Sequence, residues 1–398
     1  MVRQILIGIV CAIVFAAALS VYGIFDVHIV AYALAIWAVA CMFMRGNNAL
    51  YITGAFALAT IVVWGGVAVS GLAEKNAATP EQYLAEYNPD MAFYTFAPDR
   101  KVTMEQEAGL LARIDPRIEP VKREIVFATD KNGLRNSEGV NDPQVLLIGG
   151  SFVVGNGNTQ SALISDILKE QHNIAAYNIA TPGSIDQQAL LALTMMKEQG
   201  LVKNGVLFLF EGEDFKPFST EVHYPLKRVI SYLSNNELGR LLREYRDGFL
   251  ANSADKAGVV TYPIGARNLA FSKAYIEEAT AETYEADPKF EELLASLSDS
   301  AGLIKTVVFI PTKLRVYASL VGGGAPEVPE SPKLVALRAM EANHAFKVYD
   351  LTPHLQAKAI GAWGQRKELI WWTDDVYWNE YGAEVAAELV KDVVVGNM

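Results

Sequence analysis

The sequence predicts an α/β protein in which three transmembrane helices precede a parallel β-sheet that helices cover on both faces. Two observations support this prediction. Residues 1–72 carry only three fully charged side chains, whereas the rest of the 398-residue chain alternates short apolar runs with segments of helical periodicity. Near-continuous apolar strands that alternate with helices are typical of a parallel sheet buried on both sides.

The predicted membrane region consists of three uncharged apolar stretches, residues 4–22, 27–44 and 50–72. Each is long enough, at 1.5 Å per residue, to cross a hydrocarbon layer of about 30 Å. The first stretch has an alternative interpretation as a cleavable signal peptide, because residues 16–20 include small side chains that suit a peptidase. Two further spans that follow within a few residues favour an anchor.

The orientation of the spans follows from the basic residues that flank them, since Lys and Arg are retained on the cytoplasmic side. Arg3 precedes the first span and Arg45 separates the second from the third, while Asp26 lies in the turn between the first two. The amino terminus is therefore expected inside the cell. Three crossings then place residues 73–398 in the periplasm or extracytoplasmic space, and make the chain a multi-pass protein of the inner (plasma) membrane.

The charge of the chain excludes one class of partner. Its net charge is −11 at pH 7, and residues 73–398 hold 32 Lys and Arg against 44 Asp and Glu, a net charge of −12. Sequence-independent binding of nucleic acid needs clustered basic residues, and no polybasic run is present. The two cysteines, Cys11 and Cys41, both fall in apolar stretches. We therefore expect neither a disulfide framework nor a thiolate metal cluster in the soluble part.

Five short apolar runs predict the strands of the sheet, and helical periodicity follows several of them. The strands are 145–148, 175–179, 205–210, 306–310 and 347–349. In a parallel sheet, functional side chains come from the loops at the carboxyl ends of the strands. Here those loops are Gly149-Gly150-Ser151, Ala180-Thr181-Pro182-Gly183 and Glu211-Gly212-Glu213-Asp214, and a further polar loop, Thr373-Asp374-Asp375-Val376-Tyr377, precedes the last helix.

These four loops, in this order and spacing, resemble the blocks of the SGNH/GDSL hydrolase superfamily, and most closely its membrane-anchored bacterial branch similar to the alginate O-acetylation proteins. Further matching segments are 129–136, 310–317 and 349–353. The resemblance implies a three-layer α/β/α, flavodoxin-like domain. We divide the chain accordingly into the membrane region 1–72 and an extracytoplasmic SGNH-like domain 73–398, with a lead-in 73–140 and a core 141–398 that carries an insertion at about 215–300.

The resemblance also implies roles for individual residues. In active members a Ser of the first block attacks an acyl group, a Gly of the second and an Asn of the third bind the oxyanion, and an Asp-x-x-His supplies the base. Ser151, Gly183 and Asp374 occupy three of these positions. Glu213 stands in place of the Asn and Tyr377 in place of the His; Gly150 also replaces the usual Asp of the first block.

These replacements remove the groups that hydrolysis needs. An imidazole with a pKa near 6.5 accepts the proton of a serine hydroxyl, but a phenol titrates near 10, so Tyr377 is a poor base. An ionised Glu213 offers only acceptor oxygens where an oxyanion requires donors. Residues 73–398 contain four histidines, and each fits a solvated or capping role better than that of a base: His172, His223, His344 and His354.

Other residues allow more than one interpretation. Ser151 is either a nucleophile or the start of a helix, and the missing base favours the latter. Glu211, Asp214 and Asp375 add carboxylates at the same sheet edge, but no recognised metal-binding spacing is present, so we predict no metal and no other cofactor. Four tryptophans suit either core packing or an aromatic contact surface: Trp363, Trp371, Trp372 and Trp378.

We predict from these observations a membrane-anchored, SGNH-like pseudoenzyme that serves as a binding or assembly subunit of a membrane complex. Its expected partner is an integral membrane protein, with an envelope polysaccharide as a second candidate. The alternative is an O-acetyltransferase or esterase that acts on a cell-envelope polysaccharide with Ser151 as nucleophile.

Overall fold

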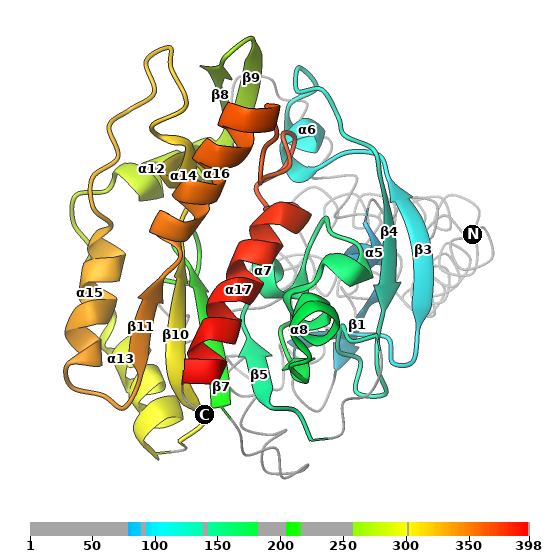
Figure 1. Ribbon diagram of the computed structural model, residues 1–398, viewed down its shortest axis with the longest axis vertical. Coiled ribbons are helices and arrows are strands. Elements are labelled where there is room, and N and C mark those ends of the chain that lie inside the picture. The colour runs from blue at the N-terminus through cyan, green and yellow to red at the C-terminus, as the bar shows by residue number, and fades with distance from the viewer. Residues whose placement is uncertain are drawn as a thin grey trace, which may run out of the picture. The chain divides into compact units, whose positions relative to one another are not determined.

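Five parallel strands form the central sheet in the computed structural model (Figure 1): β5 (Val145–Ile148), β6 (Ala176–Asn178), β7 (Asn204–Phe210), β10 (Ile304–Ile310) and β11 (Lys347–Asp350). Their order across the sheet is β11-β10-β7-β5-β6, and each neighbouring pair is parallel. All five predicted strands are therefore confirmed to within two residues at either end, and with them the α/β class.

The structure describes residues 79–88, 93–137, 142–181, 204–215, 258–300 and 302–396. These residues belong to one unit formed by residues 78–221 and 255–398. The three predicted spans lie outside the described residues. Among the helices that are described, none combines the length and the apolar character needed to cross a membrane.

One face of the sheet is covered by α8 (Ile164–His172), α16 (Thr352–Arg366) and α17 (Glu380–Gly396), which lie in front of the strands in Figure 1. Alternate strand residues such as Val145, Leu147 and Phe208 point into this layer and pack with buried apolar side chains of the three helices. The alternation reflects the two-residue period of a strand, which sends successive side chains to opposite faces.

The opposite face is covered by α13 (Pro288–Ala295) and α15 (Pro332–Glu341). The intervening strand residues, including Leu146, Leu207 and Phe309, pack here against buried side chains of these two helices. Because both faces are buried, the strands consist of apolar residues almost throughout, as the sequence indicates. The described core thus has helices on each side of one parallel sheet.

Three antiparallel pairs lie outside the central sheet. In the lead-in, β1 (Ala85–Asn88) pairs with β2 (Phe93–Phe96), and β3 (Lys101–Gln106) pairs with β4 (Arg123–Ala128). After the undescribed residues 216–257, β8 (Val259–Ile264) pairs with β9 (Arg267–Ser272). The remaining short elements are α5 (Pro80–Leu84), α6 (Leu110–Ile114), α7 (Ser151–Val154), a 3₁₀ turn (Gln160–Ala162), α12 (Lys273–Thr280), a π-helical turn (Ser296–Ser300) and α14 (Lys313–Tyr317).

Gly133 allows the lead-in to make a turn that other residues cannot make. Its φ is +69°, and a Cβ atom added there would lie 2.2 Å from the carbonyl oxygen of Phe96. We expect Gly133→Ala to lower the free energy of unfolding by at least about 1–2 kcal/mol, because the alanine adds left-handed strain and a backbone clash. Urea unfolding followed by tryptophan fluorescence measures the change.

Gly361 provides the matched control, since it lies within α16 and a Cβ atom there would meet nothing within 4 Å. We expect Gly361→Ala to raise the free energy of unfolding by about 0.5–1 kcal/mol, because alanine is the better helix former. Equal stability of the two variants would contradict the conformation of Gly133.

Candidate functional site

The order of the strands reverses direction at one point of the sheet, between β5 and β7. The chain moves from β5 outward to β6, then returns past β5 to β7 and continues to β10 and β11. Ligand sites in open α/β sheets form at such a reversal, outside the carboxyl ends of the two strands that flank it. The loops that begin with Gly149, after β5, and with Glu211, after β7, therefore meet at the position where a site is expected.

A pocket lies at this position, and its open space, including solvent at its mouth, is about 390 Å³. It brings together three of the predicted site residues, Ser151, Glu213 and Tyr377, from loops that are far apart in the sequence. Its other lining residues are mainly aromatic or apolar: Gly150, Phe152, Phe208, Phe210, Asp214, Tyr275 and Ile310. We refer to it below as the switch-point pocket.

Ser151 is the first residue of α7, and its side chain is half-buried. Gly150, at the N-cap, supplies no capping side chain. Gly149 must remain small, because a Cβ atom there would lie 2.6 Å from Val153. The helix ends after one turn at Gly155, whose φ is +84°. Gly149 and Gly150 thus fit a tight turn that presents the serine hydroxyl at the end of β5.

A network of buried polar side chains holds this turn in position through hydrogen bonds. Arg135 is fully buried and donates to the carbonyl oxygens of Val154, Gly155 and Asn158 at 3.0, 2.8 and 2.6 Å. Burial lowers the pKa of Arg135 to about 10, although the charge of Glu81 acts in the opposite direction. The guanidinium therefore fixes the path of the chain around α7. The sequence marked segment 129–136 as part of the resemblance but did not reveal this role.

A second part of the network links the lead-in to β6. Asn136 donates to the carbonyl of Asn178 at 3.0 Å and accepts from its backbone N–H at 2.9 Å, and Asn178 donates to the carbonyl of Val153 at 2.9 Å. The carboxylate of Asp130 accepts from Asn136 and from the phenol of Tyr177. Side chains from the lead-in and from β6 thus hold α7 in place.

Tyr377 lies beside Ser151, where the resemblance places a base. Both residues line the same pocket. Burial raises the pKa of Tyr377 above its usual value near 10, and the nearby side chains of Ser151 and Asn156 only partly offset this shift. The phenol is therefore neutral at physiological pH and does not provide the proton acceptor that activates a serine.

Glu213 presents a carboxylate to the pocket from the loop after β7, and its side chain is exposed. The phenol of Tyr275, on α12, donates to its Oε1 at 2.5 Å. Burial raises the pKa of Tyr275 far above its usual value, and the negative charge of Glu213 adds to the shift. Tyr275 could not be found from the sequence, because nothing in its local pattern connects it with a loop 62 residues earlier.

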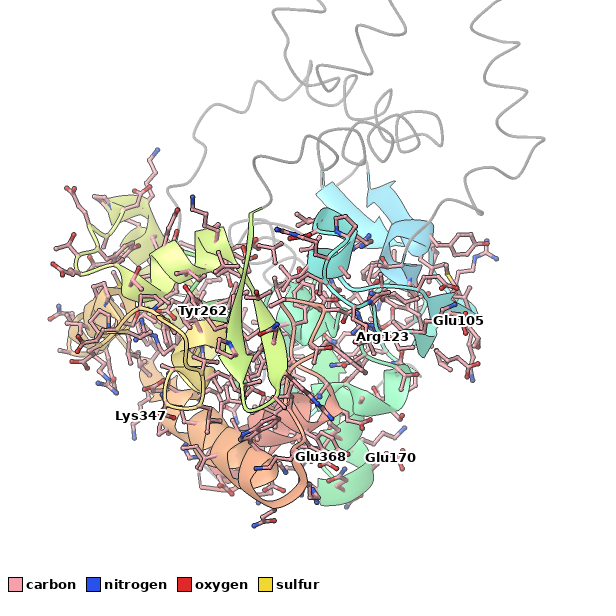
Figure 2. The ribbon with its side chains drawn as sticks, turned by 90° about the horizontal axis from the view of Figure 1, so that it is seen from above. Glu105, Arg123, Glu170, Tyr262, Lys347 and Glu368 are labelled. Atoms are coloured by element: carbon pink, nitrogen blue, oxygen red, sulfur yellow. The ribbon has the colours of Figure 1, made fainter. Side chains whose placement is uncertain are left out.

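Asp374 does not line the pocket. Its side chain is completely buried, and it accepts from the backbone N–H groups of Gly109 at 2.6 Å and Val121 at 2.8 Å, and from the guanidinium of Arg123 at 3.2 Å. Figure 2 shows Arg123 among packed side chains, with Glu105 at the outer edge of the same hairpin. The carboxylate thus anchors the lead-in to the loop that carries Tyr377.

Lys313 holds the same loop from the other side. It is buried, and its ammonium donates to the carbonyl oxygens of Trp372 at 2.8 Å and Asp375 at 3.0 Å. Burial lowers the pKa of Lys313 to about 7, against the opposing effect of the carboxylates of Asp375 and Asp374. The loop before α17 is therefore fixed on both sides by buried charged groups.

Gly183 and His223 lie outside the described residues, so the structure does not place the second block or the histidine nearest to the third. His172, His344 and His354 are described, and none of them is among the residues that line the pocket. His172 lies at the end of α8 with its Nε2 3.2 Å from Glu388. No described imidazole is thus in a position to serve Ser151.

His344 joins three segments on the far side of the sheet. Its Nδ1 lies 2.7 Å from Asp299 and its Nε2 3.3 Å from Glu291. The hydrogen bond with Asp299, and less so that with Glu291, raises the pKa of His344 above 6.5. A raised pKa in the folded state stabilises the protein below the unfolded-state pKa, and this contribution is lost as the pH rises through the folded-state pKa.

We therefore expect the wild-type protein to lose stability as the pH rises above about 6.5, in a way that His344→Gln does not. The effect should be small, because both carboxylates are substantially exposed and screened by solvent. The melting temperature of the two proteins across this pH range tests the expectation, and parallel profiles would refute it.

The tryptophans separate into two groups. Trp371 and Trp378 are each 1% exposed and lie in the core, with ring centroids 6.0 Å apart. Trp372 lies under Arg123, whose guanidinium carbon is 4.4 Å from the ring centroid, and Trp363 lies next to Gly265 in the turn between β8 and β9. The alternative of core packing therefore holds for Trp371 and Trp378.

The predicted carboxylates do not gather around a common point. Glu211 is buried against Arg315, with Oε1 2.6 Å from the guanidinium, whereas Asp374 and Asp375 both contact Arg123. Within the ranges that the structure describes, no group of three or more His, Cys, Asp or Glu side chains is arranged to hold a metal ion.

No protein-family model, no curated protein and no solved structure matches this chain. The function is therefore inferred from the site itself.

Proposed function

We propose that this chain is a membrane-anchored, SGNH-like pseudoenzyme that acts as a binding or assembly subunit of a membrane complex. In this proposal the described core is an SGNH-like three-layer domain in the periplasm. The three apolar stretches, 4–22, 27–44 and 50–72, anchor it in the inner membrane. The strand order supports the fold part of the proposal, because, numbered along the chain, the five strands follow the flavodoxin-like order 2-1-3-4-5.

The observation that carries the functional part is the pairing of Ser151 with a phenol. The serine lies at the expected edge of the sheet, but the titratable side chain beside it in the pocket, at the position of the base, is Tyr377, whose pKa burial raises. General-base catalysis normally contributes a factor of about 10²–10⁴, and a neutral phenol does not supply it. Asp374, which would orient an imidazole, is instead occupied by the lead-in.

Glu213 adds a second argument against acyl transfer. Its carboxylate lines the same pocket as Ser151, at the position where the resemblance implies an oxyanion donor. A carboxylate repels the developing negative charge, and the loss of one oxyanion donor alone reduces the rate by about 10²–10³. The pocket retains the shape of a site without its chemical groups, which suits a role in binding or assembly.

The membrane region suggests the class of partner. A single helix is enough for anchoring, so three spans favour packing against an integral membrane protein. An envelope polysaccharide remains the second candidate, and the net charge of −12 over residues 73–398 argues against nucleic acid. Purification of the full chain from its own membranes in mild detergent should yield an integral membrane protein in stoichiometric amount; isolation of the chain alone would contradict this part.

The test of inactivity compares the full chain with Ser151→Ala. Both proteins are incubated with p-nitrophenyl acetate and with a serine-directed fluorophosphonate. We expect equal hydrolysis rates and no labelling of Ser151. Hydrolysis or labelling that disappears in Ser151→Ala would overturn the proposal and establish the alternative, an esterase or O-acetyltransferase that uses Ser151.

The double variant Tyr377→His, Glu213→Asn restores the two replaced groups at once. An inert scaffold should gain hydrolysis of p-nitrophenyl acetate, because the variant provides an imidazole and an amide donor in the pocket. Each single variant is the matched control. A loss of pre-existing activity in the double variant would show that the native residues form a working catalytic site of another kind.

A further inference from the structure

The polar side chains that line the switch-point pocket are two carboxylates, which only accept hydrogen bonds when ionised, and three hydroxyl groups, which can accept as well as donate. Glu213 contributes an exposed carboxylate, Ser151 a hydroxyl, and Tyr275 and Tyr377 their phenols. Asp214 adds a second negative charge, while one of its oxygens accepts from the backbone N–H of Phe210 at 2.7 Å. Among the described residues that line the pocket there is no Lys, Arg or His.

The carboxylate of Glu213 is held in a defined position. Its backbone N–H donates to the carbonyl of Phe210 at 3.2 Å, which fixes the turn after β7. The phenol of Tyr275 donates to Oε1, and its ring packs against Phe210 with centroids 5.0 Å apart. Within the described part of the chain no cationic side chain forms an ion pair with Glu213, whose carboxylate lines the pocket.

The walls of the pocket are aromatic. The ring of Phe152 lies 4.6 Å from that of Phe210 and 5.2 Å from that of Tyr377, measured between centroids. Aromatic faces attract cations through their quadrupole, and the attraction strengthens where water is excluded. A carboxylate together with aromatic walls favours a positively charged ligand and disfavours an anionic one.

We propose that the switch-point pocket binds a primary ammonium group. Such a group has three N–H donors and no acceptor, which complements the carboxylate of Glu213 and the hydroxyl of Ser151. The inference rests on the proposed function, because a serine that performs no acyl transfer is free to hold a ligand. The ammonium group comes either from a small alkylamine or from a lysine side chain of a partner protein.

The test measures binding to the full chain in a non-ionic detergent by isothermal titration calorimetry. The probes are n-butylammonium, its neutral counterpart 1-butanol, and n-butyltrimethylammonium, which keeps the charge but has no N–H donor. We expect n-butylammonium to bind at least about tenfold more tightly than either of the others, as a charge-assisted hydrogen bond implies.

Variants of the lining residues test whether n-butylammonium binds in the switch-point pocket. Glu213→Gln should weaken n-butylammonium binding by about tenfold or more, and Tyr275→Phe should weaken it several-fold because the carboxylate loses its orienting phenol. Glu327→Gln removes the same charge at an exposed position outside the pocket and should leave the affinity unchanged. Melting temperatures of all variants verify that each remains folded.

The relative affinity of two probes distinguishes the two possible sources of the ammonium group. Tighter binding of Nα-acetyl-lysine methylamide than of n-butylammonium indicates a lysine side chain, and the reverse order indicates a small alkylamine. No binding of either probe, equal binding of 1-butanol, or an unchanged affinity in Glu213→Gln would overturn the inference. Fluorophosphonate labelling of the same preparation is read separately, so that labelling of Ser151 refutes the proposed function, whereas its absence with no amine binding refutes the ammonium site alone.

Discussion

Replacement of Asp374 by alanine is expected to lower the free energy of unfolding by about 3–5 kcal/mol. The carboxylate is completely buried and accepts from two backbone N–H groups, of Gly109 and Val121, and from the guanidinium of Arg123. Alanine leaves all three donors without this acceptor, and Arg123 keeps only Asp375 as a carboxylate partner. Asp374→Asn should cost less, because an amide retains one acceptor oxygen.

Two measurements distinguish this anchoring role from a catalytic one. Urea unfolding gives the change in stability, and amide hydrogen exchange should accelerate in peptides that cover residues 108–123. Asp392→Ala is the control, because that carboxylate is 71% exposed and its removal should change the stability by no more than about 0.5 kcal/mol. A stable Asp374→Ala protein with unchanged exchange would contradict the anchoring role.

The second large effect is expected at Glu211, which belongs to the third sequence block. Its carboxylate receives two nitrogens of Arg315, at 2.6 and 3.0 Å, and the backbone N–H of Thr312 at 3.0 Å, all in the protein interior. Glu211→Leu should lower the free energy of unfolding by about 3–5 kcal/mol, because the variant leaves a buried guanidinium without its counter-ion.

A double-mutant cycle separates the cost of the unpaired charge from the value of the pair. Glu211→Leu combined with Arg315→Met should recover part of the lost stability, since the two apolar side chains replace the buried ions. Arg338→Met is the surface control, because Arg338 and its partner Glu330 are 50% and 66% exposed. A double variant that is less stable than Glu211→Leu would show that Arg315 acts mainly through its backbone acceptors.

The sequence was sufficient to predict the strands of the fold and part of the candidate site. The strands are apolar on both faces, which leaves a signal that does not depend on distant parts of the chain. The rule that ligand sites lie at the carboxyl ends of parallel strands was enough to bring Ser151 and Glu213 together, whereas Tyr377 was placed beside them by the resemblance. The residues meet in one pocket because of the topology of the sheet, and the apolar runs that predict the strands define that topology well.

The remaining features depend on contacts that no local pattern encodes. Asp374 matched the position of a catalytic acid, yet its partners lie more than 250 residues earlier in the chain. Tyr275 reaches Glu213 from a helix that the sequence analysis did not predict. The hydrogen bonds of Arg135 around α7 go to backbone oxygens, so the side chains of these partner residues give no sequence signal for the interaction.

The anchoring of the lead-in by Asp374 has a consequence for the order in which the protein assembles. Ribosomes synthesise Arg123 251 residues before the carboxylate that neutralises it. During translation the lead-in therefore emerges with its buried groups unsatisfied, and contacts of such long sequence separation form slowly. The wall of the pocket that contains Tyr377 is consequently completed only after the segment with Asp374 and Tyr377 has been synthesised, so that chains truncated before this segment do not form the complete pocket.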